Sequence, residues 1–152
     1  DPRKTLGYGI GESLKNRGVS KEEIRKKTAN LLEQCGLEAS YMDRYPHQVS
    51  GGQCQRAAIA RALAVDPKVI ICDEATSALD VTVQKRVIDL LQNLQENKNL
   101  SYVFICHNLA LVQQFCDRVI VMKDGQIVET IESKRLKEAV HPYTKALVEA
   151  SV

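Results

Sequence analysis

The sequence lacks long apolar runs, and none approaches the ~20 residues that a membrane-spanning helix needs. A signal peptide is missing as well, and the chain starts at Asp1 and Pro2 without an initiator methionine. We therefore expect a piece of a longer product. With 152 residues, 44% apolar and 26% charged, the chain can form one domain with a real core.

A concentration of charge of one sign is also absent. The net charge is +2 at pH 7, and the basic residues are dispersed along the chain. This pattern gives no support to a nucleic-acid-binding face or a membrane-surface patch. We see no internal repeat and no low-complexity segment.

Cysteine pairs with C-x-x-C spacing do not occur, and the cysteine count is odd. The five cysteines are Cys35, Cys54, Cys72, Cys106 and Cys116. Their spacing argues against a metal site or a disulfide framework. We expect reduced, structural thiols in a cytosolic protein.

The first 67 or so residues are predicted to be mainly helical. Three glycines weaken a helix over 5–17, whereas Ser20 and Glu23 form a capping box for a clear helix that ends near Cys35. Residues 37–49 are expected to be a short irregular or helical link. An alanine-rich helix follows over 51–65.

After residue 67, short apolar runs alternate with helical patterns. The runs 69–72 and 102–106 do not alternate with polar residues, which is typical of strands buried on both faces. Apolar positions from Val83 to Leu94 predict a long helix, and 109–115 predicts a short one. The order of strands and helices predicts an α/β fold with a mainly parallel sheet.

The last third of the chain predicts a β-hairpin and a helical tail. Asp124-Gly125 separates two β-prone runs, which is a strong hairpin signal. The tail from Ser133 has two helical stretches split by His141-Pro142. We expect three parts: a helical part over 1–67, an α/β core over 68–131 and a helical tail over 132–152.

Ser50, Gly51, Gly52 and Gln53 lie where the alanine-rich helix begins. Two glycines let the backbone approach a ligand, and the free N–H groups of a helix N-terminus attract an anion. Taken alone, Ser-Gly-Gly is more often a plain N-cap with a glycine turn. The continuation through Gln53 into the helix favours an anion site.

Acidic and histidine residues end the two apolar runs. Asp73 and Glu74 would lie at the carboxyl end of a parallel strand, where α/β proteins bind ligands. Asp73 suits Mg²⁺, and Glu74 could polarise an attacking water in phosphoryl transfer; the alternative is two solvated carboxylates. His107 is more often structural in such a place, but on a neighbouring strand it could reach the same phosphate.

In this order, the segments resemble the second half of an ATP-binding cassette (ABC) ATPase. Val49–Gln53 resembles the signature motif, Val69–Asp73 the Walker B strand, Ser77–Asp80 the D-loop and His107 the histidine of the H-loop. The resemblance implies a partial P-loop NTPase-like cassette, with a parallel-sheet core, a helical subdomain and a C-terminal β-hairpin. It also implies ATP and Mg²⁺ as ligands.

The resemblance implies a role for each site residue. In this family two subunits sandwich two ATP molecules. Ser50, Gly51, Gly52 and Gln53 would contact the γ-phosphate of ATP held by the opposite subunit, and Asp80 would lie at the dimer interface. Asp73 would hold Mg²⁺, and Glu74 and His107 would be catalytic.

Two further segments, Tyr45–Gln48 and His141–Leu147, resemble the ATPase subunits of oligopeptide, dipeptide and nickel importers. The implied partners are a second ABC ATPase subunit, in a homo- or heterodimer, and membrane permease subunits. An extracytoplasmic solute-binding protein would be an indirect partner. Nucleic acid is not expected as a partner. The implied location is the cytoplasmic face of the cell membrane, as a peripheral subunit.

A phosphate loop of the form G-x-x-x-x-G-K-S/T is absent from the 152 residues. Because that loop supplies most ligands of the β- and γ-phosphates, we expect this chain alone to hydrolyse ATP negligibly. Bare strand edges at 69–72 and 102–106 also predict self-association or strand exchange.

Two alternatives to an importer ATPase stay open at the level of the sequence. The chain could be a non-catalytic interaction module that pairs with a partner bearing a phosphate loop. It could also belong to an ABC ATPase without a transport role, although the importer-like segments argue against that reading.

Overall fold

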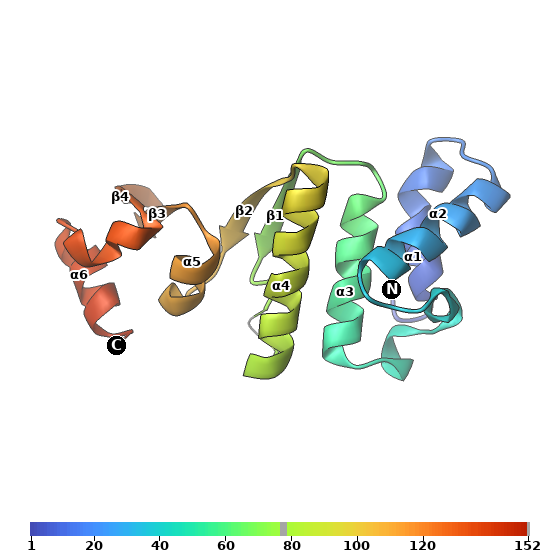
Figure 1. Ribbon diagram of the computed structural model, residues 1–152, viewed down its shortest axis with the longest axis horizontal. Helices are drawn as coiled ribbons and strands as arrows, with labels where there is room; N and C mark the ends of the chain where they lie inside the picture. Colours follow the sequence, from blue (N-terminus) through green and yellow to red (C-terminus); the bar gives the residue numbers. More distant parts are fainter. Residues whose placement is uncertain (77–78, 152) are drawn as a thin grey trace. The chain divides into compact units, whose positions relative to one another are not determined.

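The computed structural model describes residues 1–76 and 79–151 and divides into two units, Asp1–Val103 and Phe104–Val152. The elements up to the boundary are α1 (Leu6–Asn16), α2 (Lys21–Gln34), the 3₁₀ turns η1 (Ala39–Asp43) and η2 (Pro46–Gln48), α3 (Gly51–Leu63), β1 (Val69–Asp73), α4 (Val81–Lys98) and β2 (Ser101–Ile105), which crosses it. The elements after it are α5 (Leu109–Phe115), β3 (Arg118–Lys123), β4 (Gln126–Glu132), η3 (Ser133–Glu138) and α6 (Pro142–Glu149) (Figure 1). No helix in the described ranges is long and apolar enough to span a bilayer.

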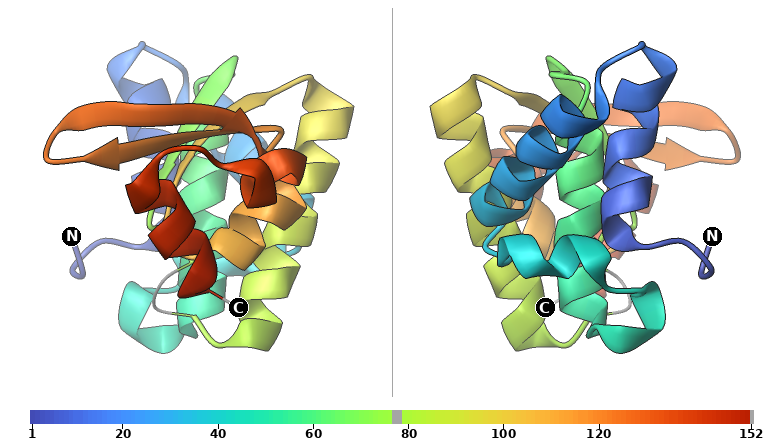
Figure 2. Two further views of the ribbon diagram at one scale, coloured as in Figure 1. Left: turned by 90° about the vertical axis from the view of Figure 1, so that its left-hand side faces the viewer. Right: turned by 90° about the vertical axis from the view of Figure 1, so that its right-hand side faces the viewer.

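Helices α1 and α2 both pack on α3, and the right-hand view of Figure 2 shows α2 crossing in front of it. Gly11, one of the glycines of α1 that weakened the prediction of a helix, lets α1 and α2 pack closely. A Cβ on Gly11 would lie 2.5 Å from Ile24 Cγ2, so only glycine allows α1 and α2 to come this close. Ile10 of α1 and Leu32 of α2 are fully buried.

The predicted capping box of α2 is confirmed. The Glu23 N–H donates to Ser20 Oγ at 3.3 Å, and the Ser20 N–H donates to Glu23 Oε2 at 3.3 Å. After the helix ends, Gly36 adopts a φ of +69°, which a C-terminal cap requires. The link predicted over 37–49 forms the two 3₁₀ turns η1 and η2.

Strands β1 and β2 form a two-stranded parallel sheet, and α4 lies against one of its faces. Ile70 and Cys72 of β1 are buried, and the Tyr102 hydroxyl of β2 donates to the Leu91 carbonyl of α4 at 3.0 Å. Val69 and Ile71, on the other face, are 52% and 68% exposed. The prediction that these runs are buried on both faces is therefore wrong here, because helices cover only one face.

Helix α4 contains the long apolar face that the sequence predicts. Val87, Ile88, Leu91 and Leu94 are buried. The helix ends at Asn99, which has a φ of +52° and makes a left-handed cap without glycine.

The second unit is built on the hairpin of β3 and β4, which confirms the prediction from Asp124-Gly125. Both turn residues have positive φ, +48° and +77°, as a tight hairpin turn requires. The strands pair in register from Arg118 opposite Glu132 to Lys123 opposite Gln126, with a bulge beside Val121. One hairpin face packs on a core of Val112, Val119, Val121 and Leu136.

The tail docks on this hairpin through Glu129. The N–H groups of Val140 and His141 donate to the Glu129 carboxylate at 2.8 and 3.3 Å. His141 then caps α6 by accepting from the N–H of Tyr143 at 3.2 Å on Nδ1. The His141-Pro142 pair therefore has a structural role that the sequence did not reveal.

Candidate functional site

The site begins with Ser50 and Gln53, which close a capping box at the start of α3. The Gln53 N–H donates to Ser50 Oγ at 3.3 Å, and the Ser50 N–H donates to Gln53 Oε1 at 2.9 Å. The first intrahelical bond runs from the Cys54 N–H to the Ser50 carbonyl at 2.9 Å. The N–H groups of Gly51 and Gly52 precede it and, by helix geometry, have no intrahelical acceptor.

The two glycines of this loop face different surroundings. Gly51 is exposed, and a Cβ there would lie 3.6 Å from Leu79 Cδ2, an ordinary contact. Gly52 is buried, and a Cβ there would lie 2.3 Å from Val83 Cγ1. Gly52 is therefore required for packing α3 on α4, while its N–H stays in the first turn of the helix.

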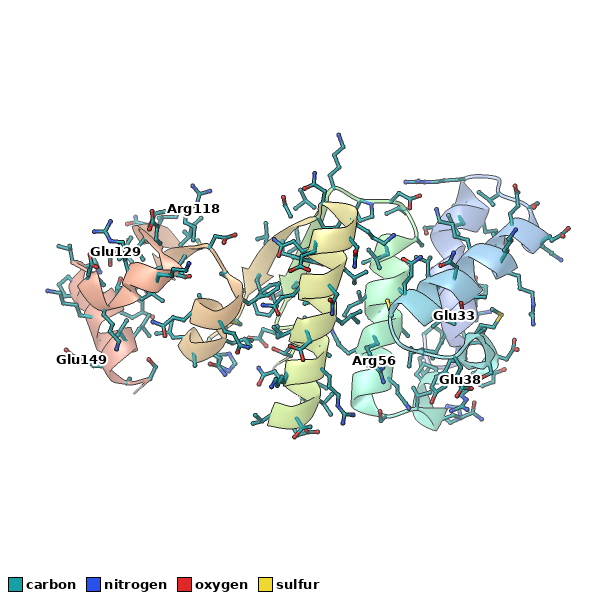
Figure 3. All side chains as sticks on the ribbon, viewed as in Figure 1. Glu33, Glu38, Arg56, Arg118, Glu129 and Glu149 are labelled. Carbon is teal, nitrogen blue, oxygen red and sulfur yellow. The ribbon has the colours of Figure 1, made fainter. Side chains whose placement is uncertain are left out.

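Two contacts from other elements fix the start of α3. Gln53 Nε2 donates to the Tyr41 hydroxyl of η1 at 2.9 Å. Arg56, on the N-terminal half of α3 (Figure 3), donates from Nη1 to the Gly36 carbonyl at 2.7 Å and so ties α3 to the end of α2. The exposed Ser50 and Gly51 thus lie on a rigid frame, where N–H groups and the helix dipole favour an anion such as phosphate.

Asp73 and Glu74 are exposed at the carboxyl end of β1, as predicted. Glu74 has a φ of +46°, a left-handed conformation that costs a non-glycine residue on the order of 1 kcal/mol. The backbone after it is anchored by buried Thr76, whose Oγ1 accepts from Gln84 Nε2 of α4 at 3.2 Å.

Asp80 caps α4 by accepting from the Val83 N–H at 3.0 Å on Oδ1. The predicted D-loop includes residues 77 and 78, which lie outside the described residues. Because Val83 also meets Gly52, the N-terminal ends of α3 and α4 lie together, and Figure 1 shows the two helices side by side. The structure thus brings Ser50–Gln53 and Asp80 to one end of this helix pair.

His107 is exposed directly after β2, in the second unit. The next residue, Asn108, caps α5 by accepting from the Leu111 N–H at 3.1 Å. The histidine is therefore held between a strand end and a helix start. Its approach to Glu74 stays a prediction.

Within residues 1–76 and 79–151, no group of three or more His, Cys, Asp or Glu side chains could hold a metal ion. Asp73 offers a single exposed carboxylate. This fits Mg²⁺, which keeps several waters and is usually bound through one or two carboxylates plus substrate phosphates. The five cysteines are free thiols, and burial raises the pKa of Cys35 to about 12.

Tyr41, Val83 and Gln84 support the site, and none was predicted from the sequence. Tyr41 is 12 residues from its partner Gln53, and Gln84 is 8 from Thr76. Neither spacing is a local motif. The signals that could have indicated a close contact between helices were the missing side chain at Gly52 and the apolar Val83 in a helical pattern.

The fold is that of part of an ATP-binding cassette of the ABC type. Residues 2–77 match the ABC transporter family, and the chain belongs to that family. A solved ATP-binding cassette, in a dimeric post-hydrolysis state bound to ADP and Pi, is 33% identical with a TM-score of 0.75, covering 88% of this chain and 59% of that one.

Importer proteins are among the curated relatives. The oligopeptide transport ATP-binding protein OppF of Escherichia coli (strain K12) is 46% identical over 99% of this chain, and the dipeptide transport ATP-binding protein DppF of Haemophilus influenzae is 45% identical over 99%. The glutathione import ATP-binding protein GsiA of Salmonella typhimurium is 49% identical over 99%. This chain spans 46%, 47% and 24% of those relatives, about half their length or less.

Proposed function

We propose that this chain is part of the ATP-binding subunit of an ABC importer, which couples ATP hydrolysis to the uptake of oligopeptides, dipeptides or a related small solute. The observation that carries the proposal is 46–49% identity to importer ATP-binding proteins across 99% of the chain. The importer-like segments at Tyr45–Gln48 and His141–Leu147 add support.

The loop over Ser50–Gln53 binds the γ-phosphate of ATP held by an opposite subunit. Its exposed end carries the N–H groups of the first helical turn and the Ser50 hydroxyl, which are donors suited to a phosphate oxygen. Preorganised donors of this kind stabilise the charge that develops in phosphoryl transfer. Asp80, at the same end of the helix pair, lies at the interface between the subunits.

Asp73 and Glu74 act on the ATP bound by their own subunit. Asp73 would hold Mg²⁺, which neutralises charge on the β- and γ-phosphates when bound. Glu74 polarises the attacking water through its carboxylate. His107 contacts the same γ-phosphate and helps to order the site.

The partners are a second ATP-binding subunit, membrane permease subunits and, indirectly, an extracytoplasmic solute-binding protein. The helical part over 1–67 contacts the permease, and closure on ATP drives the membrane subunits. The complex lies at the cytoplasmic face of the membrane. The division into 1–67, 68–131 and 132–152 stays a prediction.

Because the phosphate loop is missing from the sequence, this chain by itself is expected to turn over ATP negligibly. We would therefore join it to the upstream half of a cassette of this family, which brings that loop. The fused cassette should hydrolyse MgATP, whereas its Glu74→Gln form should be ~10³-fold slower, a loss in the range of removing an activating group.

Two results would speak against this proposal. One is Glu74-dependent hydrolysis by the unfused chain, since it would require a nucleotide site within these residues. The other is a folded fused cassette that binds ATP but hydrolyses it at the same rate with Gln at position 74. Circular dichroism and ATP binding, measured on both forms, separate loss of chemistry from loss of folding.

A further inference from the structure

The side-chain amide of Gln53 is held at both ends. Its Oε1 accepts from the Ser50 N–H at 2.9 Å, and its Nε2 donates to the Tyr41 hydroxyl at 2.9 Å. A carboxamide has one acceptor end and one donor end, so these two partners fix which end faces Ser50. The bond to Tyr41 is partly buried, which strengthens it relative to one in water.

Tyr41 is itself held by its neighbours in the first unit. The guanidinium of Arg44 lies over its ring, 4.0 Å from the ring centre, a cation–π contact. The backbone of Arg44 is tied to α1, because its carbonyl accepts from the Leu6 N–H at 2.9 Å. The Tyr41 ring that carries this hydroxyl is therefore covered by Arg44, whose backbone is bonded to α1.

We propose that Tyr41 is a positioning residue for the loop at Ser50, through its hydrogen bond to Gln53. This inference rests on the proposed function in one respect, namely that the ligand of the loop is a phosphate. With Nε2 bound to Tyr41, the Gln53 carbonyl stays aimed at the Ser50 N–H, and the capping box stays closed. Ser50 Oγ then accepts from the Gln53 N–H and keeps its own hydroxyl proton for a ligand.

Tyr41→Phe is the sharpest probe, because it keeps the ring against Arg44 and removes only the hydroxyl. The Gln53 amide then keeps the Ser50 N–H as its partner on Oε1 but loses the bond that holds Nε2, so its side chain becomes more mobile. Tyr8→Phe is the matched control: Tyr8 lies on α1 with Lys4 Nζ 4.8 Å from its ring centre, outside this chain of contacts.

The first measurement is NMR of the Gln53 side-chain NH₂ protons and the Ser50 N–H in the 152-residue chain. Tyr41→Phe should shift both signals and speed the exchange of the Ser50 N–H with solvent about fivefold, as expected for the loss of a hydrogen bond worth ~1 kcal/mol. Tyr8→Phe should change neither. In a Gln53→Leu background, Tyr41→Phe should have no further effect on the Ser50 N–H.

Unchanged Ser50 and Gln53 signals in a folded Tyr41→Phe chain would overturn the proposal. The proposal would also be overturned if Tyr41→Phe changed the Ser50 N–H equally in the wild-type and Gln53→Leu backgrounds, since Tyr41 would then act only through packing. Thermal unfolding of each variant shows which chains are folded, and Gln53→Leu alone, which should speed the same exchange, provides a second route to the same test.

A titration with inorganic phosphate separates this inference from the proposed function. In the wild-type chain, phosphate should shift the N–H signals of Gly51 and Gly52, and Tyr41→Phe should weaken that binding about fivefold, the same hydrogen-bond loss. If phosphate binds the wild-type and Tyr41→Phe chains with equal affinity, as judged by these N–H signals, the positioning role of Tyr41 is overturned. If phosphate shifts the signals of neither chain, the result counts against the phosphate site. If Tyr41→Phe still alters the Ser50 and Gln53 signals, the same experiment supports the positioning role.

Discussion

Gly52 and Val83 touch so closely that any side chain at position 52 would overlap Val83. A Cβ on Gly52 would lie 2.3 Å from Val83 Cγ1. The contact joins the first turn of α3, which Ser50 caps, to the first turn of α4, which Asp80 caps. Two segments 30 residues apart are thereby fixed at one end of the helix pair.

The first prediction concerns this contact. Gly52→Ala should lower the free energy of unfolding by about 1–3 kcal/mol, the usual cost of overpacking. Val83→Ala in the same chain should remove most of that penalty, because it deletes the overlapping methyl groups. Urea unfolding of the two single variants and the double variant gives the coupling energy.

Gly51→Ala is the control, because its Cβ would meet only Leu79 Cδ2 at 3.6 Å. Its cost should be less than 1 kcal/mol, or negative, since alanine favours a helix more than glycine does. Additive effects of Gly52→Ala and Val83→Ala would contradict the contact.

A second prediction concerns Arg56. Arg56→Ala should lower the free energy of unfolding by about 1.5–3 kcal/mol, because a charged donor leaves the Gly36 carbonyl. Arg61→Ala, on the exposed side of the same helix, is the matched control and should cost less than about 0.5 kcal/mol. Equal losses in the two variants would show that the Gly36 contact does not stabilise the chain.

A third prediction concerns the dependence of the tail on pH. The Thr144 hydroxyl, followed by the Val140 N–H, lowers the pKa of the Glu129 carboxyl below its ordinary value of 4.5. Because the pKa of Glu129 is lowered in the folded state, the ionised carboxylate contributes fully to stability above pH 4.5. This contribution is lost as the pH falls through the pKa of the folded state. The N–H groups of Val140 and His141 should therefore be protected from hydrogen exchange at pH 6 and lose protection on acidification.

Glu129→Gln should weaken that protection at pH 6 and remove its dependence on pH, because the amide cannot ionise. Glu149→Gln, which changes a carboxylate near the end of α6 (Figure 3), is the control and should leave the profile of the wild-type chain unchanged. A wild-type profile that stays flat down to pH 3 would contradict the role of Glu129.

The exposed face of the β1–β2 sheet leads to a fourth prediction. Val69 and Ile71 are 52% and 68% exposed, and apolar strand surfaces of this kind favour pairing with another copy. The chain should self-associate at micromolar concentrations, and Ile71→Lys should reduce that association by placing a charge on the face. Light scattering tests both statements, and a monodisperse wild-type monomer would refute them.

Local patterns in the sequence predicted most of the elements. The capping box at Ser20 and the turn at Asp124-Gly125 depend on neighbouring residues, so the sequence contains what determines them. The partial exposure of the strands was not predicted. The apolar run 69–72 shows which residues are apolar, but it does not show whether helices cover one face of the sheet or both.

The site was predictable as far as its motifs are local. Ser50 and Asp73 lie where the sequence predicts, at a helix start and a strand end. Asp80 caps α4, whereas its place at a dimer interface stays a prediction. The supporting contacts of Tyr41 with Gln53 and of Val83 with Gly52 join separate elements. They arise from tertiary packing, which no spacing in the sequence encodes.

The most direct test asks whether Ser50 and Glu74 of one chain act in two different ATP sites of the dimer. Two forms of the fused cassette are prepared, one with Ser50→Arg and one with Glu74→Gln, each inactive alone. Mixed and allowed to exchange subunits, they should recover roughly a quarter of wild-type MgATP hydrolysis, because half of the dimers are mixed and each contains one intact site. Failure to recover activity, with subunit exchange demonstrated, would mean that Ser50 and Glu74 of one subunit act in the same ATP site, which contradicts the proposed arrangement.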